Sequence, residues 1–154
     1  MDIDYINLFE ISFSTFLGFL SAILATVLID KRNEKTEVKK IIHNTKNELS
    51  EMLEILTNLE ADYYINPIKF SYWKSLISGN KLNLLCDEIW YVELLLVYDH
   101  VIDFNEWNNK RTEILFLNGK GSFDEFSLEI NEAIQSQVII IIKEINSVLE
   151  NMSK

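Results

Sequence analysis

Cysteine, proline and glycine are scarce in this sequence, which has one cysteine, one proline and four glycines among 154 residues. The single cysteine, Cys86, cannot form an internal disulfide, so the chain suits a reducing compartment such as the cytoplasm. Because Pro67 is the only proline, long helices can run without interruption. The few glycines also exclude collagen-like and linker-like segments. This composition favours an all-α fold.

Positive charge is scarce as well. The 14 Lys and Arg residues are outnumbered by 24 Asp and Glu residues, and the formal net charge is −10. All 14 basic residues and all but three of the acids lie beyond residue 29, which leaves that part of the chain near −7. Because binding of duplex nucleic acid needs an excess of positive charge, we expect no such partner. The net charge does not exclude a local basic pocket.

Sequence motifs of catalysis are missing too. Two histidines and one cysteine cannot build a usual zinc site, and the segment 119–122 lacks the spacing of a phosphate-binding loop. On one continuous helix, Cys86 and His100 would lie about 21 Å apart, too far for a catalytic pair. Neither arginine is followed four to six residues later by histidine, as one class of ribonuclease requires. We therefore expect no enzyme activity, no catalytic residue, no metal and no cofactor.

What the sequence does contain is a run of nineteen uncharged residues, from Ile11 to Ile29. As a helix this run is roughly 28 Å long, about the thickness of a hydrocarbon core. A helix also satisfies its own backbone groups, as lipid requires. The run predicts a transmembrane helix in a lipid bilayer. The alternative is a core helix of a soluble protein.

The flanks of this run predict its orientation. The preceding residues contain three acids and no base, whereas five basic residues follow: Lys31, Arg32, Lys35, Lys39 and Lys40. Basic flanks stay in the cytoplasm. We therefore expect a short extracytoplasmic tail at 1–10, a membrane helix at 11–29 and a cytoplasmic helical domain at 30–154.

Small side chains recur every fourth residue within the run. They are Ser14, Gly18, Ala22 and Thr26. Such a stripe lets two helices approach closely in lipid and predicts a homo-oligomer, although small residues are common in membrane helices in any case.

Apolar periodicity predicts the remaining helices. Beyond Asp30 the first helix is expected to continue to about Glu60, with a seam in steps of four and three: Val38, Ile42, Thr45, Leu49, Met52, Leu56 and Leu59. Asn66 and Pro67 predict the start of a short helix that ends at 78–80. Long helices are expected at 82–117 and 123–151, the former apolar on two sides and therefore buried between neighbours. The prediction is an N-terminal transmembrane helix continuing into an antiparallel bundle of about three long helices and one short one.

Two groups of residues are candidates for binding a ligand. Aromatic and basic residues in the short helix offer stacking and phosphate contacts, and a basic pair lies on the following long helix; together they are Lys69, Tyr72, Trp73, Lys74, Lys110 and Arg111. The alternative is that the aromatic side closes the bundle and that the basic pair is surface charge. Asp99, Asp103 and Glu106 share a helix face, but the Glu-x-x-His partner of a carboxylate metal site is missing, so we interpret them as solvated.

In layout the chain resembles the small single-pass membrane accessory effectors of bacterial CRISPR antiviral systems. The resemblance rests on the acidic start, the single apolar run, the flank at Asp30–Arg32 and the helical domain of about 120 residues. It implies a location in the bacterial inner membrane and a cytoplasmic domain that oligomerises and senses a cyclic oligoadenylate. It further implies that the membrane helix then perturbs the bilayer. A membrane-tethered adaptor that holds a cytoplasmic protein is the alternative.

Overall fold

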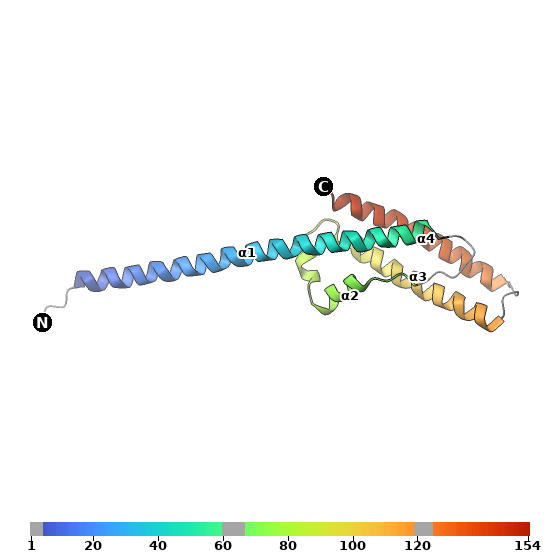
Figure 1. Ribbon diagram of the computed structural model, residues 1–154, viewed down its shortest axis with the longest axis horizontal. Coiled ribbons are helices and arrows are strands. Elements are labelled where there is room, and N and C mark those ends of the chain that lie inside the picture. The colour runs from blue at the N-terminus through green and yellow to red at the C-terminus, as the bar shows by residue number, and fades with distance from the viewer. Residues whose placement is uncertain (1–4, 60–66, 119–124) are drawn as a thin grey trace. The chain divides into compact units, whose positions relative to one another are not determined.

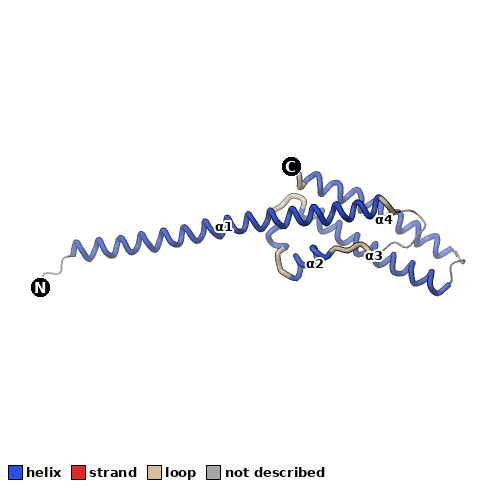
Figure 2. The backbone as a smooth tube through the Cα atoms, in the orientation of Figure 1, coloured by secondary structure: helices blue, strands red, loops and turns tan. Residues whose placement is uncertain are grey.

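The computed structural model describes residues 5–59, 67–118 and 125–154, with side chains described for 13–59, 67–114 and 129–154. Over these residues the chain is helical and contains no strand (Figures 1 and 2). The elements are α1 (Tyr5–Thr57), α2 (Ser71–Ser78), a 3-10 helix (Leu82–Leu85), α3 (Tyr91–Asn118) and α4 (Glu125–Asn151). The predicted all-α fold, with three long helices and one short one, is confirmed. The chain divides into two compact units, Met1–Lys40 and Ile41–Lys154.

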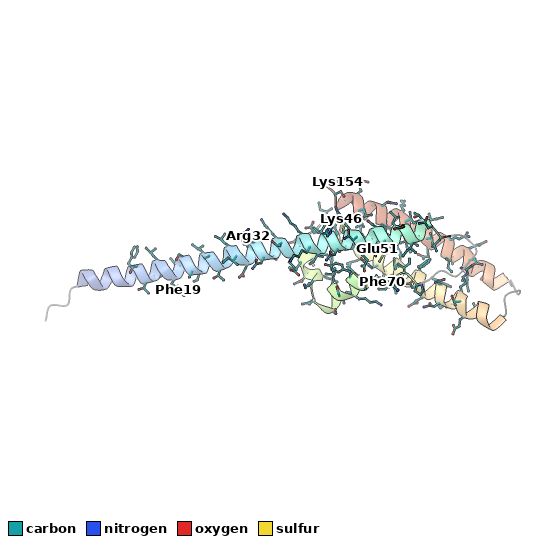
Figure 3. All side chains as sticks on the ribbon, in the orientation of Figure 1. Phe19, Arg32, Lys46, Glu51, Phe70 and Lys154 are labelled. Carbon is teal, nitrogen blue, oxygen red and sulfur yellow. The ribbon has the colours of Figure 1, made fainter. Side chains whose placement is uncertain are left out.

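The first unit is the N-terminal part of α1. All its described side chains from Phe13 to Thr36 are exposed, including every apolar residue of the uncharged run. Phe19 and Arg32, both in this part of α1, are labelled in Figure 3. None of the described apolar side chains in this part of α1 is buried, whichever side of the helix they lie on. This part of α1 is long enough and apolar enough to cross a membrane.

The second unit contains the hydrophobic core. The predicted seam of α1 lies inside it: Thr45, Leu49, Met52 and Leu56 are all buried. Ile41 is buried as well, whereas Ile55 on the flank of the seam is 44% exposed. The seam is therefore covered by other helices of the same chain.

Helices α3 and α4 run side by side in opposite directions (Figure 1). Two polar links set their register: His100 Nδ1 lies 2.7 Å from Glu144 Oε2, and Glu93 accepts hydrogen bonds from Ser147 and Asn151. On the same part of α4, Ile141, Ile145 and Val148 are buried. The β-branched run 138–142, which alone would suit a strand, is helical as predicted.

The short helix begins later than predicted. Pro67 was expected at its first position, but residues 67–70 are not helical and α2 starts at Ser71. The reason is that Ile68 is held by Asn105 on α3: its N–H donates to Asn105 Oδ1 at 2.8 Å and its carbonyl accepts from Asn105 Nδ2 at 3.0 Å. The amide side chain therefore binds both polar backbone groups of Ile68, and no helical partner is needed there.

The predicted end of the short helix at 78–80 is confirmed. Asn80, rather than Gly79, has the left-handed backbone, with a φ of 52°. Lys81 N–H donates to Leu76 carbonyl and Asn80 N–H to Ile77 carbonyl, which is the Schellman pattern of helix ends. Asparagine is among the few residues other than glycine that adopt this conformation readily.

The start of the next long helix was predicted wrongly. Residues 82–90 form the 3-10 helix and turns, and α3 begins only at Tyr91. Leu85 and Trp90 are both buried, yet on an α-helix residues five apart point about 140° from each other. The tighter path, with hydrogen bonds from Glu88 N–H to Leu85 carbonyl and from Tyr91 N–H to Glu88 carbonyl, lets both reach the core.

This shift exposes part of one of the two apolar sides predicted for 82–117, which consists of Leu85, Ile89, Val92 and Leu96. Leu85 is buried, but Ile89, Val92 and Leu96 are 93%, 64% and 47% exposed. The other predicted stripe is buried at Leu94, Tyr98 and Val101, while Ile102 is 38% exposed. Helix α3 is thus buried on one side only, and the expectation of a helix enclosed on two sides is wrong.

Candidate functional site

A highly connected polar side chain of the second unit is the carboxylate of Glu48 on α1. It is only 8% exposed. Its Oε1 accepts a hydrogen bond from Tyr72 N–H at 2.7 Å, and its Oε2 accepts from Trp73 N–H at 3.1 Å and from Tyr98 Oη at 2.6 Å. One buried side chain therefore joins α1 to both α2 and α3.

These bonds make Glu48 the N-terminal cap of α2. The residue at the N-cap position, Phe70, has no side chain that can cap, so the first backbone N–H groups of α2 need another acceptor. The carboxylate of Glu48 supplies it and places its negative charge at the positive end of the helix dipole. With eight residues α2 is too short to be stable alone, so its position depends on this contact and on packing.

Two aromatic rings pack against Tyr98, the third donor to Glu48. The ring of Tyr98 stacks on Trp73, with centroids 4.1 Å apart and planes 5° from parallel. It meets Phe70 edge-on at 6.2 Å. Burial, together with the hydrogen bond to Glu48, raises the pKa of the Tyr98 hydroxyl above its ordinary value of 10.0. The phenol therefore stays protonated and donates to Glu48.

The residues predicted to bind a ligand fall into different environments. Trp73 is 4% exposed and its ring packs inside the fold on Tyr98. Tyr72 and Arg111 are half-buried, while the three lysines are exposed. Lys74 Nζ lies 4.7 Å above the ring of Phe70, which is labelled in Figure 3, and Lys110 Nζ lies 4.8 Å above the ring of Trp107. The buried position of Trp73 agrees with the alternative interpretation, in which the aromatic side of the short helix closes the bundle.

Helical geometry separates the two predicted basic groups. Asn105 contacts Ile68, just before α2, and so marks the side of α3 on which that segment lies. Lys110 and Arg111 follow Asn105 by five and six residues, which turns each more than 100° away from that side. The pair on α3 and the group around α2 therefore do not face one another.

The predicted packing residues lie on the first unit. A Cβ added at Gly18 would meet no atom within 4 Å, so the helix has open space there. The hydroxyl of Thr26 donates to Ala22 carbonyl at 2.9 Å, and that of Ser21 to Gly18 carbonyl at 2.8 Å. These hydroxyls are satisfied within the helix, which suits them both to lipid and to a close helix contact.

The acidic face of α3 is exposed to solvent, as the sequence predicts. Asp99, Asp103 and Glu106 are all exposed. Among the described residues no three His, Cys, Asp or Glu side chains are grouped closely enough to hold a metal ion. His100 is instead paired with Glu144, and the exposed His43 lies 3.4 Å from Asn47 Nδ2.

Two of the residues that organise the site, Glu48 and Asn105, were missed from the sequence. Both had a signal. Glu48 lies three residues after Thr45 and four before Met52, so helical spacing places a carboxylate on the apolar seam. Asn105 follows Tyr98 by seven residues and shares its face. What the spacing does not reveal is which donors they meet.

Comparisons of this chain with models of protein families, with curated proteins and with solved structures gave no match.

We predict that Glu48→Gln lowers the free energy of unfolding by about 2 kcal/mol, because the amide turns a donor toward groups that themselves donate. Unfolding of the full chain in detergent micelles measures this change. Amide hydrogen exchange should rise selectively over residues 72–81. Glu51→Gln, an exposed glutamate one turn along the same helix, is the matched control and should change neither quantity. Equal effects of the two substitutions would contradict the capping role.

The raised pKa of Tyr98 predicts an alkaline loss of stability. The unfolded phenol ionises near pH 10, whereas the buried phenol does not, so its contribution is complete below pH 10 and falls as the pH rises further. Between pH 9 and pH 11 the wild type should lose about 1 kcal/mol more than Tyr98→Phe. The measurement is unfolding of both proteins across this range. Parallel pH profiles would show that Tyr98 is not the titrating group.

Proposed function

We propose that this chain is a single-pass protein of the bacterial inner membrane, with its N-terminus outside and its second unit in the cytoplasm. The observation that carries the proposal is that every residue from 13 to 29 is exposed and uncharged, on a continuous helix. In water, so large an apolar surface without a partner is unfavourable, and lipid removes the cost. The five basic residues that follow support the orientation.

The single cysteine offers a direct test of this topology. Cys86 is exposed, so a membrane-impermeant maleimide should label it only after the cells are lysed. In a Cys86→Ser background, Asp2→Cys should be labelled in intact spheroplasts. Labelling of Cys86 in sealed cells, or release of the chain by alkaline carbonate, would contradict the proposal.

We further propose that the protein is an oligomeric antiviral-defence effector that acts without catalysing a reaction. A cyclic oligonucleotide binds its cytoplasmic unit, and the membrane helices then associate and perturb the bilayer. The layout of the chain supports this role through its resemblance to CRISPR accessory effectors. The small-residue stripe of α1, with open space at Gly18, supports the association. The apolar seam of α1 does not supply this association, because Thr45, Leu49, Met52 and Leu56 are already buried.

We predict that Gly18→Leu abolishes oligomers and leakage, because the larger side chain keeps two helices apart. Dye-filled liposomes with the full chain should leak when cyclic oligoadenylates are added, and should stay sealed with the variant. Val27→Leu, on the opposite side of the helix, is the matched control and should leak like the wild type. No leakage by the wild type with any ring size would contradict the effector role.

A second function, a membrane-tethered adaptor, is favoured by a different observation. Helix α3 leaves Val92, Leu95, Leu96 and Ile102 exposed, although the sequence predicted a helix buried on two sides. Contiguous exposed apolar residues commonly mark a protein contact. In this case pull-down from the native host should recover one dominant partner, and liposomes should remain sealed.

A further inference from the structure

The exposed side of α3 has a regular pattern. Val92, Leu95, Asp99, Ile102 and Glu106 follow one another in steps of three and four, so they form a single stripe along the helix. Leu96 and Asp103 lie beside it. All seven side chains are exposed. We call this surface the α3 outer face.

The outer face combines apolar and acidic chemistry. Its apolar members are 64% (Val92), 36% (Leu95), 47% (Leu96) and 38% (Ile102) exposed. Its three other members are carboxylates in its C-terminal half, and the first basic residue along the stripe is the exposed Lys110, four residues after Glu106. The whole second unit is acidic, with nine basic against eighteen acidic residues. A partner for this face must therefore bring apolar side chains and positive charge together.

We propose that the α3 outer face binds a cationic amphipathic helix of another protein. A stripe with steps of three and four accepts a second helix, whose own apolar residues recur with the same spacing. Lysine or arginine residues flanking those positions reach Asp99, Asp103 and Glu106. This inference names the partner's chemistry for the adaptor function and rests on that proposed function.

Charge argues against the other occupants of this face. A second copy of the chain would bring the same three carboxylates against its own, and like charges across an interface are unfavourable. The anionic inner leaflet would meet the same repulsion. Complementary charge on a basic helix instead speeds association and sets its orientation.

The test uses the full chain in nanodiscs of zwitterionic phosphatidylcholine. The probe is a fluorescent 18-residue peptide of leucine and lysine, with leucines on one helical face and lysines on the other. A scrambled peptide of the same composition lacks the apolar face. Empty nanodiscs give the background, and fluorescence anisotropy reports binding.

We expect the amphipathic peptide to bind and the scrambled peptide to bind at least about tenfold more weakly. The substitutions Asp99→Asn with Glu106→Gln, and separately Leu95→Ser with Ile102→Ser, should each weaken binding about tenfold. The matched controls on α4 are Glu129→Gln with Glu132→Gln, which removes the same charge from exposed positions, and Ile139→Ser at a side chain that is 68% exposed. Both controls should bind the peptide like the wild type.

Several results would overturn the proposal. Equal weakening by the controls on α4 would show general attraction to an acidic protein, and no binding by the wild type would show that the face lacks this function. Self-association lost on Leu95→Ser with Ile102→Ser would assign the face to a second copy. These failures are distinct from failure of the adaptor function, which the pull-down tests without reference to α3.

Discussion

The fold of the second unit depends on one buried carboxylate. A charged group enclosed by protein is costly unless its oxygen atoms are hydrogen-bonded, and Glu48 meets this condition with two backbone N–H groups and one phenol. Helix α2 depends on Glu48 in turn, because the start of α2 has no capping side chain of its own. Glu48 and α2 therefore stabilise each other, and α2 would lose its place on the bundle if α1 moved along its own axis. Tyr98 extends this dependence to α3, since its hydroxyl and its ring engage Glu48 and Trp73 at once.

Helix α1 meets two different environments along its length. Up to Thr36 its side chains are exposed, and from Ile41 its apolar seam is covered by other helices. The same periodicity that specifies a coiled-coil seam in sequence is therefore used for intramolecular packing. This use limits how copies of the chain can associate, because a seam already buried in one chain is not free to pair with another. Any association must use the apolar helix or an outer face of the bundle.

The sequence predicted helices where apolar periodicity was long and uninterrupted, as along α4 and the seam of α1. It failed where contacts between distant residues override local preference. Pro67 is well suited to a helix start, but Asn105, 38 residues later, binds both backbone groups of Ile68 and holds that segment non-helical. Burial of both Leu85 and Trp90 likewise replaces the expected α-helix with a tighter turn. For the candidate site, aromatic and basic composition identified α2 but not its role, since Trp73 packs inside and the cap comes from Glu48.

The later start of α3 explains why an acidic, water-exposed surface keeps apolar residues. Because residues 82–90 bury their own anchors, α3 needs only one buried side, centred on Leu94, Val97 and Val101. Its opposite side is exposed, yet retains Val92, Leu95, Leu96 and Ile102. The more exposed of these side chains, Val92 and Leu96, contribute little to the core, and the neighbouring carboxylates keep the surface soluble without covering it. A pattern that stability does not require is evidence for contact with something else, and the chemistry of that contact follows from the charges beside it.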